Sequence, residues 1–130
     1  GVDPYLLAAM AITESRCRPE ARGGSGEYGM LQVMPGTGRW IAGRLGYAEY
    51  KPEQMLDVKT NIQYAAYYLR VSVEEFGSTT KGVLAYNAGS GGARAWLAAR
   101  DVNSHRYVRK VKAVYRDLQR VKEKSLTALG

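Results

Sequence analysis

The residue best suited to chemistry is Glu14, a carboxylate near the end of an apolar helical segment. Leu7 and Met10 precede it at helical spacing, so position 14 falls on the stripe where a core aliphatic side chain is expected. Burial disfavours the charged form of a carboxylate and raises its pKa. A protonated carboxyl in a partly apolar pocket is what general acid catalysis near neutral pH requires. The spacing therefore predicts a catalytic acid at Glu14, with solvent exposure or an ion pair to a nearby arginine as the alternative.

The elements that must position Glu14 are predicted to be helices. Apolar residues recur at helical spacing over residues 3–16, 35–46, 57–76, 80–87 and 93–99, and in a last helix that Ser104 can cap. Asp3 and Asp57 are expected N-caps, and Gly77 is an expected helix stop. A Gly-rich loop over residues 18–28 leads into a short apolar segment at 29–35. This pattern predicts a mainly α fold of about six helices, with little or no β structure beyond a small hairpin or irregular segment near Gly29.

Composition bounds the class of protein. A chain of 130 residues is one domain that can bury a core. Its single cysteine, Cys17, cannot form an internal disulfide and is expected to be a small buried hydrophobic residue. His105, the only histidine, has no set of Cys or His partners, so neither a metal site nor a cofactor is expected. No apolar run is long enough to span a membrane and no signal peptide is recognised. Because the sequence opens directly on a helix cap, a mature form or a domain of a longer protein is expected.

The charge favours polyanionic partners. The formal net charge is +7, from 19 basic and 12 acidic residues, and such a field attracts nucleic acid, anionic lipid or anionic cell-wall polymers. The basic residues of the last helix lie opposite its apolar positions and are Arg109, Lys110, Lys112, Arg116, Arg120, Lys122 and Lys124. A basic amphipathic helix can bind one of these polyanions or can simply present a solvated face.

Five short motifs follow one another along the chain. They are Glu14-Ser15, Gly-Met-Leu-Gln-Val-Met-Pro-Gly-Thr at 29–37, Asn-Ile at 61–62 with Tyr-Leu at 68–69, Ala-Tyr-Asn-Ala-Gly at 85–89, and Tyr107-Val108. In this order and with these gaps they resemble the motifs of the soluble lytic transglycosylases, whose catalytic domain has a goose-type-lysozyme-like fold. The resemblance covers nearly the whole chain. It implies a single catalytic domain over residues 1–125, and residues 126–130 are expected to form a frayed tail.

The resemblance implies a peptidoglycan lytic transglycosylase that breaks the MurNAc-β-1,4-GlcNAc bond without water. A single glutamate, here Glu14, would donate a proton to the linking oxygen and then accept one from the MurNAc C6 hydroxyl as a 1,6-anhydro ring closes. Peptidoglycan glycan strands are the implied partner, anionic wall polymers are candidates for the basic last helix, and no nucleic acid is expected. The implied location is the cell envelope or the extracellular cell wall, and a phage-associated protein also fits.

The resemblance also assigns residues around the acid. Gln32 and Met34 are expected to line the substrate cleft, because an amide both donates and accepts hydrogen bonds and a Met gives an adaptable apolar wall. Tyr86 is expected to hold its hydroxyl near Glu14, where it could hydrogen-bond the carboxyl, and Asn87 to be a nearby structural or ligand-contacting amide. A core position for Met34 and a Tyr86 satisfied by backbone are the alternatives.

Three further residues complete the predicted substrate-binding set. They are Ser15, Glu27 and Tyr107, with Tyr107 expected at the far side of the cleft. The chain departs from the family at two places in the Gly-rich loop, because Gly23 stands where a serine is common and Glu27 where a small residue is usual. Glu27 could therefore face the cleft.

Two other functions remain compatible with the sequence. A muramidase would hydrolyse the same bond with water and would need a second carboxylate, for which Glu27, Glu20 and Asp57 are the candidates. The second alternative is a domain that binds peptidoglycan or nucleic acid without cutting it. The product, an anhydro end or a reducing end, distinguishes the two enzymes.

Overall fold

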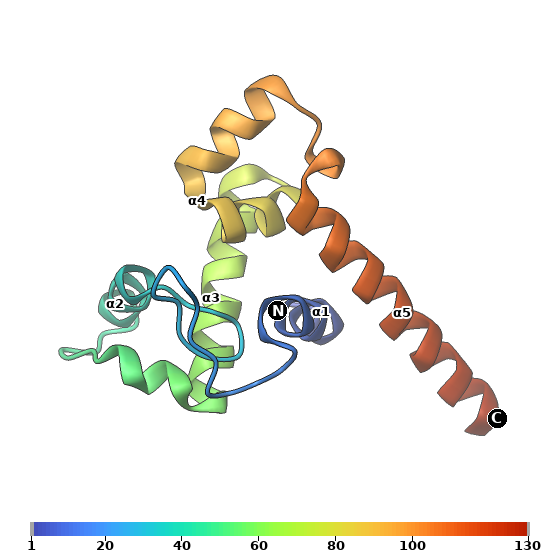
Figure 1. Cartoon of the computed structure of the whole chain (residues 1–130), viewed down its shortest axis with the longest axis horizontal. Coiled ribbons are helices and arrows are strands. Elements are labelled where there is room, and N and C mark those ends of the chain that lie inside the picture. The colour runs from blue at the N-terminus through green and yellow to red at the C-terminus, as the bar shows by residue number, and fades with distance from the viewer. Residues whose placement is uncertain (1, 130) are drawn as a thin grey trace.

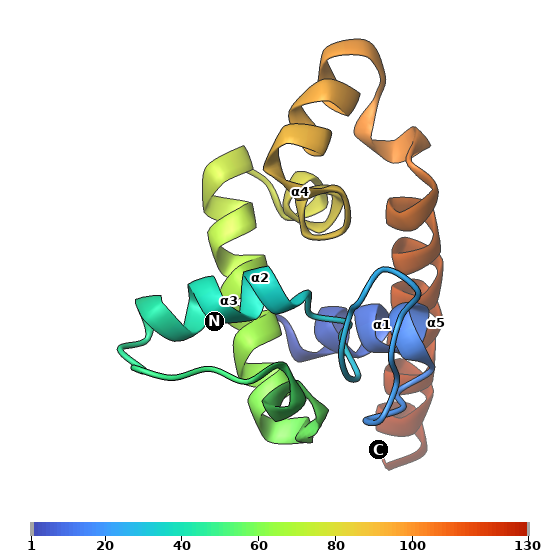
Figure 2. The ribbon, with the colours of Figure 1, turned by 60° about the vertical axis from the view of Figure 1, so that its left-hand side comes forward.

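The computed structural model describes residues 2–129 and is built from helices (Figure 1). Its α-helices are α1 (Pro4–Ser15), α2 (Pro35–Arg44), α3 (Val58–Phe76), α4 (Thr79–Ala99) and α5 (Arg106–Leu129), with the short 3-10 helices η1 (Pro52–Leu56) and η2 (Val102–Ser104). α3 packs mainly against α4, and α1 mainly against α5. In Figures 1 and 2, α1 lies between α3 and α5. The mainly α fold class predicted from the sequence is confirmed.

The helix boundaries follow from capping residues in the sequence. Asp3 accepts a hydrogen bond from Tyr5 N at 2.8 Å where α1 begins, and Asp57 accepts one from Thr60 N at 2.9 Å where α3 begins. Gly77 ends α3 with a φ of 80°, a left-handed conformation that glycine adopts readily. These three predictions are confirmed.

The two helices predicted at residues 80–87 and 93–99 form one element, α4, which bends at a single residue. Gly89 has a φ of 75° and a ψ of 164°, a conformation outside the helical region that is open almost only to glycine. The glycine run therefore redirects the helix without forming a separate loop. Figure 2 shows the second half of α4 leaving the first at an angle.

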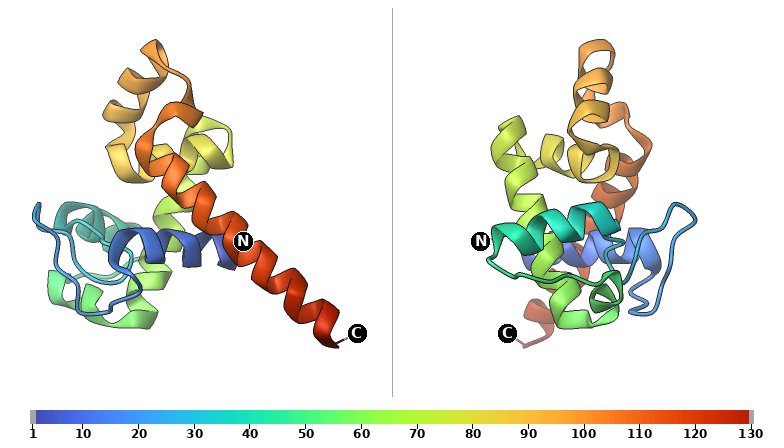
Figure 3. Two further views of the ribbon diagram at one scale, coloured as in Figure 1. Left: turned by 45° about the vertical axis from the view of Figure 1, so that its right-hand side comes forward. Right: turned by 90° about the vertical axis from the view of Figure 1, so that its left-hand side faces the viewer.

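Helix α5 begins later than the predicted cap. Ser104 belongs to η2, where its hydroxyl donates to the Asp101 carbonyl, and α5 starts at Arg106. At its other end α5 is helical to Leu129, although the sequence predicts a frayed tail from residue 126; residue 130 lies outside the described residues. Figure 3 shows this end extending away from the other helices. The domain limit at residue 125 stays a prediction.

The segment between α1 and α2 is irregular. No strand forms within residues 2–129, but isolated antiparallel bridges pair Arg22 with Tyr28 and Tyr28 with Val33. They hold the Gly-rich loop against the segment that leads into α2, as predicted near Gly29.

Across residues 2–129, none of the helices combines the length and apolar character that crossing a membrane demands.

The prediction of a buried Cys17 is wrong. α1 ends at Ser15, and the next two residues, Arg16 and Cys17, both have a positive φ, of 55° and 61°. The chain has therefore left the helix before it reaches position 17, and helical spacing no longer decides which way the side chain points. Cys17 is exposed.

Candidate active site

Glu14 lies in the last turn of α1, the helix that packs against α5. Its side chain is half-buried. The Tyr107 hydroxyl, from the first turn of α5, donates to Glu14 Oε2 at 2.9 Å. Tyr107 is itself buried, with 8% of its surface exposed. A rigid neighbouring helix therefore orients the carboxyl through one hydrogen bond.

The surroundings of Glu14 favour the protonated carboxyl. Burial raises its pKa from 4.5 to about 7, the hydrogen bond from Tyr107 acts in the opposite direction, and the negative charge of Glu27 adds to the rise. The ion pairs found within residues 2–129 do not involve Glu14, and the nearby Arg18 side chain donates to the Ser15 carbonyl instead. A carboxyl with a pKa near neutral can donate a proton and later accept one.

Ser15 joins the end of α1 to the following loop. It is 5% exposed, and its hydroxyl donates to the Met30 carbonyl at 2.7 Å and accepts from Arg18 N at 3.1 Å. Because these bonds satisfy the hydroxyl inside the protein, the geometry points to a positioning role for Ser15 and not to the predicted contact with substrate.

Asn61 on α3 anchors the same loop from the other side, a role that the sequence reasoning missed. The residue is 0% exposed. Its Oδ1 accepts from Leu31 N at 2.8 Å, and its Nδ2 donates to the carbonyls of Tyr28 at 3.1 Å and Met55 at 3.0 Å. The available signal was a polar amide on the inward stripe of α3, four residues before the buried Ala65.

Gly29 permits this close approach. Its φ is +84°, and a Cβ at this position would lie 2.1 Å from the Met55 carbonyl oxygen and 2.4 Å from Asn61 Nδ2. Only glycine fits such a space and such a backbone conformation. The loop can therefore pass beside η1 and α3 and deliver Leu31 and the residues after it to the site.

Gln32 and Glu27 lie side by side next to Gly23, and of the two only Gln32 lines the cavity described below. The Gln32 Nε2 donates to the Gly29 carbonyl at 2.8 Å and to the Ala21 carbonyl at 3.3 Å, so the amide nitrogen is engaged within the protein. A Cβ at Gly23 would lie 2.5 Å from both Gln32 Oε1 and Glu27 Oε2. The missing side chain at Gly23 therefore leaves the space that these two side chains share.

A cavity of about 180 Å³ brings together four of the predicted site residues, which are Gln32, Met34, Tyr86 and Asn87. Met34 is 41% exposed, which excludes the alternative of a core position, and Asn87 is exposed as well. A second cavity, of about 320 Å³, shares Thr37 and Tyr68 with the first. The two form one groove between α2, α3 and the bend of α4.

The hydroxyl that donates a hydrogen bond to the Glu14 carboxyl belongs to Tyr107. The prediction that Tyr86 makes this hydrogen bond is therefore wrong. The Tyr86 hydroxyl donates to the Leu31 carbonyl at 2.7 Å, which is the backbone-satisfied alternative. Tyr86 is still close to the acid, since its pKa is raised by burial and then by the charge of Glu14. The docked loop places the Leu31 carbonyl where the Tyr86 hydroxyl reaches it.

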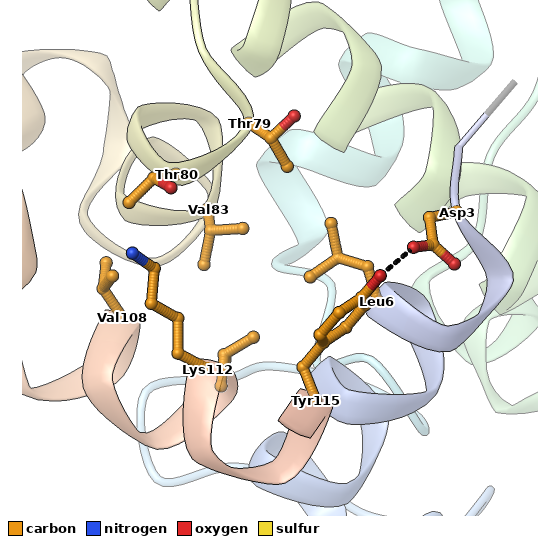
Figure 4. Close-up of a pocket in the computed structure, with 9 residues that line it drawn as sticks. Asp3, Leu6, Thr79, Thr80, Val83, Val108, Lys112 and Tyr115 are labelled. Atoms are coloured by element: carbon orange, nitrogen blue, oxygen red, sulfur yellow. Dashed lines mark hydrogen bonds between the residues drawn. The ribbon is translucent and has the colours of Figure 1, made fainter. Parts of the chain in front are cut away.

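A further cavity, of about 360 Å³, lies near the start of α1, away from Glu14 (Figure 4). Leu6, Val83 and Val108 line it, and a hydrogen bond from the Tyr115 hydroxyl to Asp3 closes one side. It contains none of the predicted site residues, so the groove beside Gln32 is the candidate substrate site. Between residues 2 and 129, no group of three or more His, Cys, Asp or Glu side chains is placed to hold a metal ion.

A family model described as the transglycosylase SLT domain matches residues 1–108. The chain belongs to this family. The SLT domain is 36% identical over 101 residues to the soluble lytic murein transglycosylase of Salmonella typhimurium, a match that covers 75% of this chain and 16% of that protein. The resemblance inferred from the motifs is thereby confirmed. The domain corresponds to only a small part of the length of this relative.

Solved structures give the same fold. The 70 kDa soluble lytic transglycosylase from Escherichia coli superposes on the SLT domain with a TM-score of 0.76 at 28% identity, over 92% of this chain and 22% of that chain. An inactive glutamate-to-glutamine mutant of the lytic transglycosylase Slt from Pseudomonas aeruginosa superposes with a TM-score of 0.77 at 26% identity, over 88% and 21% of the two chains. In that relative, exchange of one carboxylate for an amide accompanies loss of activity.

Proposed function

We propose that this SLT domain is a peptidoglycan lytic transglycosylase with Glu14 as its single acid and base. The observation that carries the proposal is a half-buried carboxyl with a pKa of about 7, which the Tyr107 hydroxyl orients. Tyr86, whose pKa the charge of Glu14 raises, lines the groove together with Gln32 and Met34. The names of the relatives support the reaction class, and the inactive glutamate-to-glutamine mutant among them supports the need for a glutamate.

The proposed reaction uses the two protonation states of Glu14 in turn. Protonated Glu14 donates to the oxygen that links MurNAc to GlcNAc, the bond from that oxygen to MurNAc C1 breaks, and GlcNAc leaves with the proton. The C1 centre becomes oxocarbenium-like or is held by the N-acetyl oxygen. The Glu14 carboxylate then takes the proton of the MurNAc C6 hydroxyl, whose oxygen bonds to C1 and closes the 1,6-anhydro ring. Glu14 ends protonated, and no water is consumed.

One carboxylate suffices in this scheme because the attacking hydroxyl belongs to the substrate. Intramolecular attack gains greatly from correct positioning of the sugar. Met34 offers an exposed apolar wall and Asn87 an exposed amide for this purpose. Since the Gln32 nitrogen is engaged by backbone carbonyls, its Oε1 is the atom available to a sugar hydroxyl or N–H.

Digestion of purified peptidoglycan tests the proposal. Wild-type protein, Glu14→Gln and the matched control Glu20→Gln, which removes an exposed carboxylate outside the groove, are compared by mass spectrometry of the released fragments. We expect fragments one water lighter than hydrolytic products from the wild type and the control, and none from Glu14→Gln. Reducing-end products would establish a hydrolase, and no product from any of the three proteins would leave a binding domain.

We also infer that the basic face of α5 binds anionic wall polymers. This helix carries eight basic and two acidic residues, a net +6 out of the chain's +7. The test is cosedimentation with cell walls at rising salt for the double variant Arg109→Gln and Arg116→Gln, with Lys59→Gln and Arg70→Gln on α3 as the charge-matched control. Weaker and less salt-sensitive binding by the α5 variant alone is expected. Equal binding by both variants would contradict the inference.

The proposed substrate also implies a location. Peptidoglycan lies in the cell envelope, so we infer that the domain acts there or in the extracellular wall, including from a phage particle. Fractionation of cells that express the natural gene, followed by detection of the protein in envelope or cytoplasmic fractions, tests this inference.

A further inference from the structure

The groove at the bend of α4 continues beyond the part that lies next to the acid. Its two cavities share Thr37 and Tyr68, but Tyr86, whose pKa the charge of Glu14 raises, lines only the smaller one. The larger one, of about 320 Å³, is the outer cavity and lies between α2 and α3, which pack against each other (Figure 2). A glycan strand in the smaller cavity therefore has a second cavity beside it for its neighbouring sugars.

Trp40 on α2 is the largest side chain in the wall of the outer cavity. It follows Thr37 by one helical turn, so both side chains lie on the same face of α2. The residue is 44% exposed. A single exposed apolar side chain is common on protein surfaces and needs no explanation. Trp40 differs because it lines a cavity that is continuous with the candidate substrate groove.

The indole of Trp40 is held in place before any ligand binds. Arg44, one turn later on α2, holds its guanidinium over the ring at 5.4 Å from the ring centre. Tyr67 on α3 packs against the indole with 6.3 Å between the ring centres, and its hydroxyl accepts a hydrogen bond from Arg44 at 3.4 Å. A ligand that stacks on the exposed part of the indole therefore costs little side-chain entropy.

The polar groups around the indole suit a sugar. They are the hydroxyls of Thr37 and Ser90 and the carboxylate of Glu75. Glu75 pairs with Arg94 at 3.5 Å, which disfavours a strongly anionic or cationic ligand and leaves further acceptor positions on the carboxylate. A pyranose ring offers apolar C–H groups to an aromatic face and hydroxyls at its edge. An indole with a few hydroxyl and carboxylate groups beside it matches both.

We propose that Trp40 forms a further sugar-binding subsite, in which its indole stacks on a pyranose ring of the glycan strand that Glu14 cleaves. The identity of this strand rests on the proposed function. The stacked sugar lies outside the bond that breaks, so Trp40 contributes to binding and takes no part in the proton transfers. Long strands that reach Trp40 bind more tightly than short ones that fill only the smaller cavity.

Binding of peptide-free glycan strands tests the proposal without turnover. The strands are freed of their stem peptides by an amidase, and every protein in the comparison carries Glu14→Gln. Trp40→Ala is expected to weaken the binding of long strands by roughly three- to tenfold, and Trp40→Phe, which keeps an aromatic ring, by less. Tyr47→Ala removes an exposed ring outside both cavities and is expected to keep the affinity of the parent protein.

Two results of this measurement would overturn the proposal. One is an affinity for long strands that Trp40→Ala leaves unchanged. The other is a loss of affinity that appears only with strands that still carry their stem peptides, because this would show a peptide site.

Trp40 also reports on its own occupancy. The chain has two tryptophans, so Trp96→Phe leaves Trp40 as the single indole. Trp96 packs against His105 and lines neither cavity of the groove. The fluorescence of the Trp96→Phe protein is expected to change as long strands are added, whereas that of the Trp40→Phe protein is expected to stay constant. Constant emission from Trp40 at saturating strand concentration would contradict stacking.

Cleavage of strands of different length separates the subsite from the chemistry. Trp40→Ala is expected to lower kcat/KM for long strands by roughly three- to tenfold and to leave kcat/KM for the shortest cleaved strands unchanged. An equal fall for both would place Trp40 at the point of cleavage and overturn the separate subsite. If wild-type protein releases no product, the proposed function fails, while the binding measurement still decides whether Trp40 holds a sugar.

Discussion

The hydroxyl of Tyr107 donates to Oε2 of Glu14 at 2.9 Å and so joins two residues that lie 93 positions apart. Each stands on a helix, Glu14 at the end of α1 and Tyr107 at the start of α5, and these two helices pack against each other. Catalytic groups are placed most accurately when rigid elements carry them. The packing of α5 on α1 therefore orients the Glu14 carboxyl as well as building the core.

Tyr107→Phe is expected to raise the pKa of Glu14 above about 7. The hydrogen bond stabilises the ionised carboxylate and lowers the pKa of Glu14, whereas burial and the charge of Glu27 raise it. Without the hydrogen bond, only the two effects that raise this pKa remain. A hydrogen bond to a charged group contributes roughly 1.5–3 kcal/mol. The acid step should persist to higher pH, while the orientation of the carboxyl is lost and kcat falls by roughly tenfold or more. The pH dependence of kcat measures both effects.

The matched control for this variant is Tyr115→Phe. Tyr115 lies on the same helix two turns later and donates to Asp3, far from the acid. The Tyr115→Phe variant should leave the pH dependence of kcat unchanged. A Tyr107→Phe profile that matches the wild-type profile would show that the hydrogen bond does not act on Glu14.

Glu14→Gln is expected to change how stability depends on pH. The folded pKa of Glu14 lies above the ordinary value of 4.5, so its contribution to stability is complete below pH 4.5, falls as pH rises to about 7 and is absent above that. The rise from 4.5 to about 7 corresponds to about 3 kcal/mol as an upper bound. The variant should therefore match the wild type at pH 4 and exceed it at pH 8. Urea unfolding at the two pH values measures this, and an equal difference at both would exclude a buried, protonated Glu14.

The sequence predicted the helix ends and the partly buried position of Glu14 because these depend on local rules. Helical spacing placed Glu14 on the inward stripe of α1, and side-chain chemistry placed the ends of α1 and α3 at Asp3, Asp57 and Gly77. The exposure of Cys17 escaped prediction because a short left-handed turn after α1 changes the direction of the chain.

The partners of the site residues were harder to predict because they depend on how the helices pack. Whether Tyr86 or Tyr107 reaches the carboxyl depends on the angle between α1, α4 and α5, which no short segment encodes. The role of Asn61 likewise depends on a loop from another part of the chain.

Asn61→Asp is expected to destabilise the fold by about 3 kcal/mol or more. The substitution replaces an N–H donor by an oxygen that would face the Tyr28 and Met55 carbonyls in a fully buried position. The free energy of unfolding at pH 7 measures the effect. Asn103→Asp, at an exposed position, should stay within about 0.5 kcal/mol of wild type. Comparable stability of the two variants would show that Asn61 does not anchor the loop.

Asn87→Ala is expected to lower kcat/KM on peptidoglycan without changing the stability of the fold. Asn87 is exposed and lines the groove beside Gln32 and Met34, so its amide is free to meet a sugar substituent. Loss of one hydrogen bond of about 1–1.5 kcal/mol lowers kcat/KM on peptidoglycan by roughly tenfold, while the unfolding midpoint stays unchanged. Gln63→Ala removes an exposed amide from α3 outside this groove and is expected to alter neither quantity. If the two variants retain the same kcat/KM, the groove at the bend of α4 does not bind the glycan, and the substrate must approach Glu14 from another side.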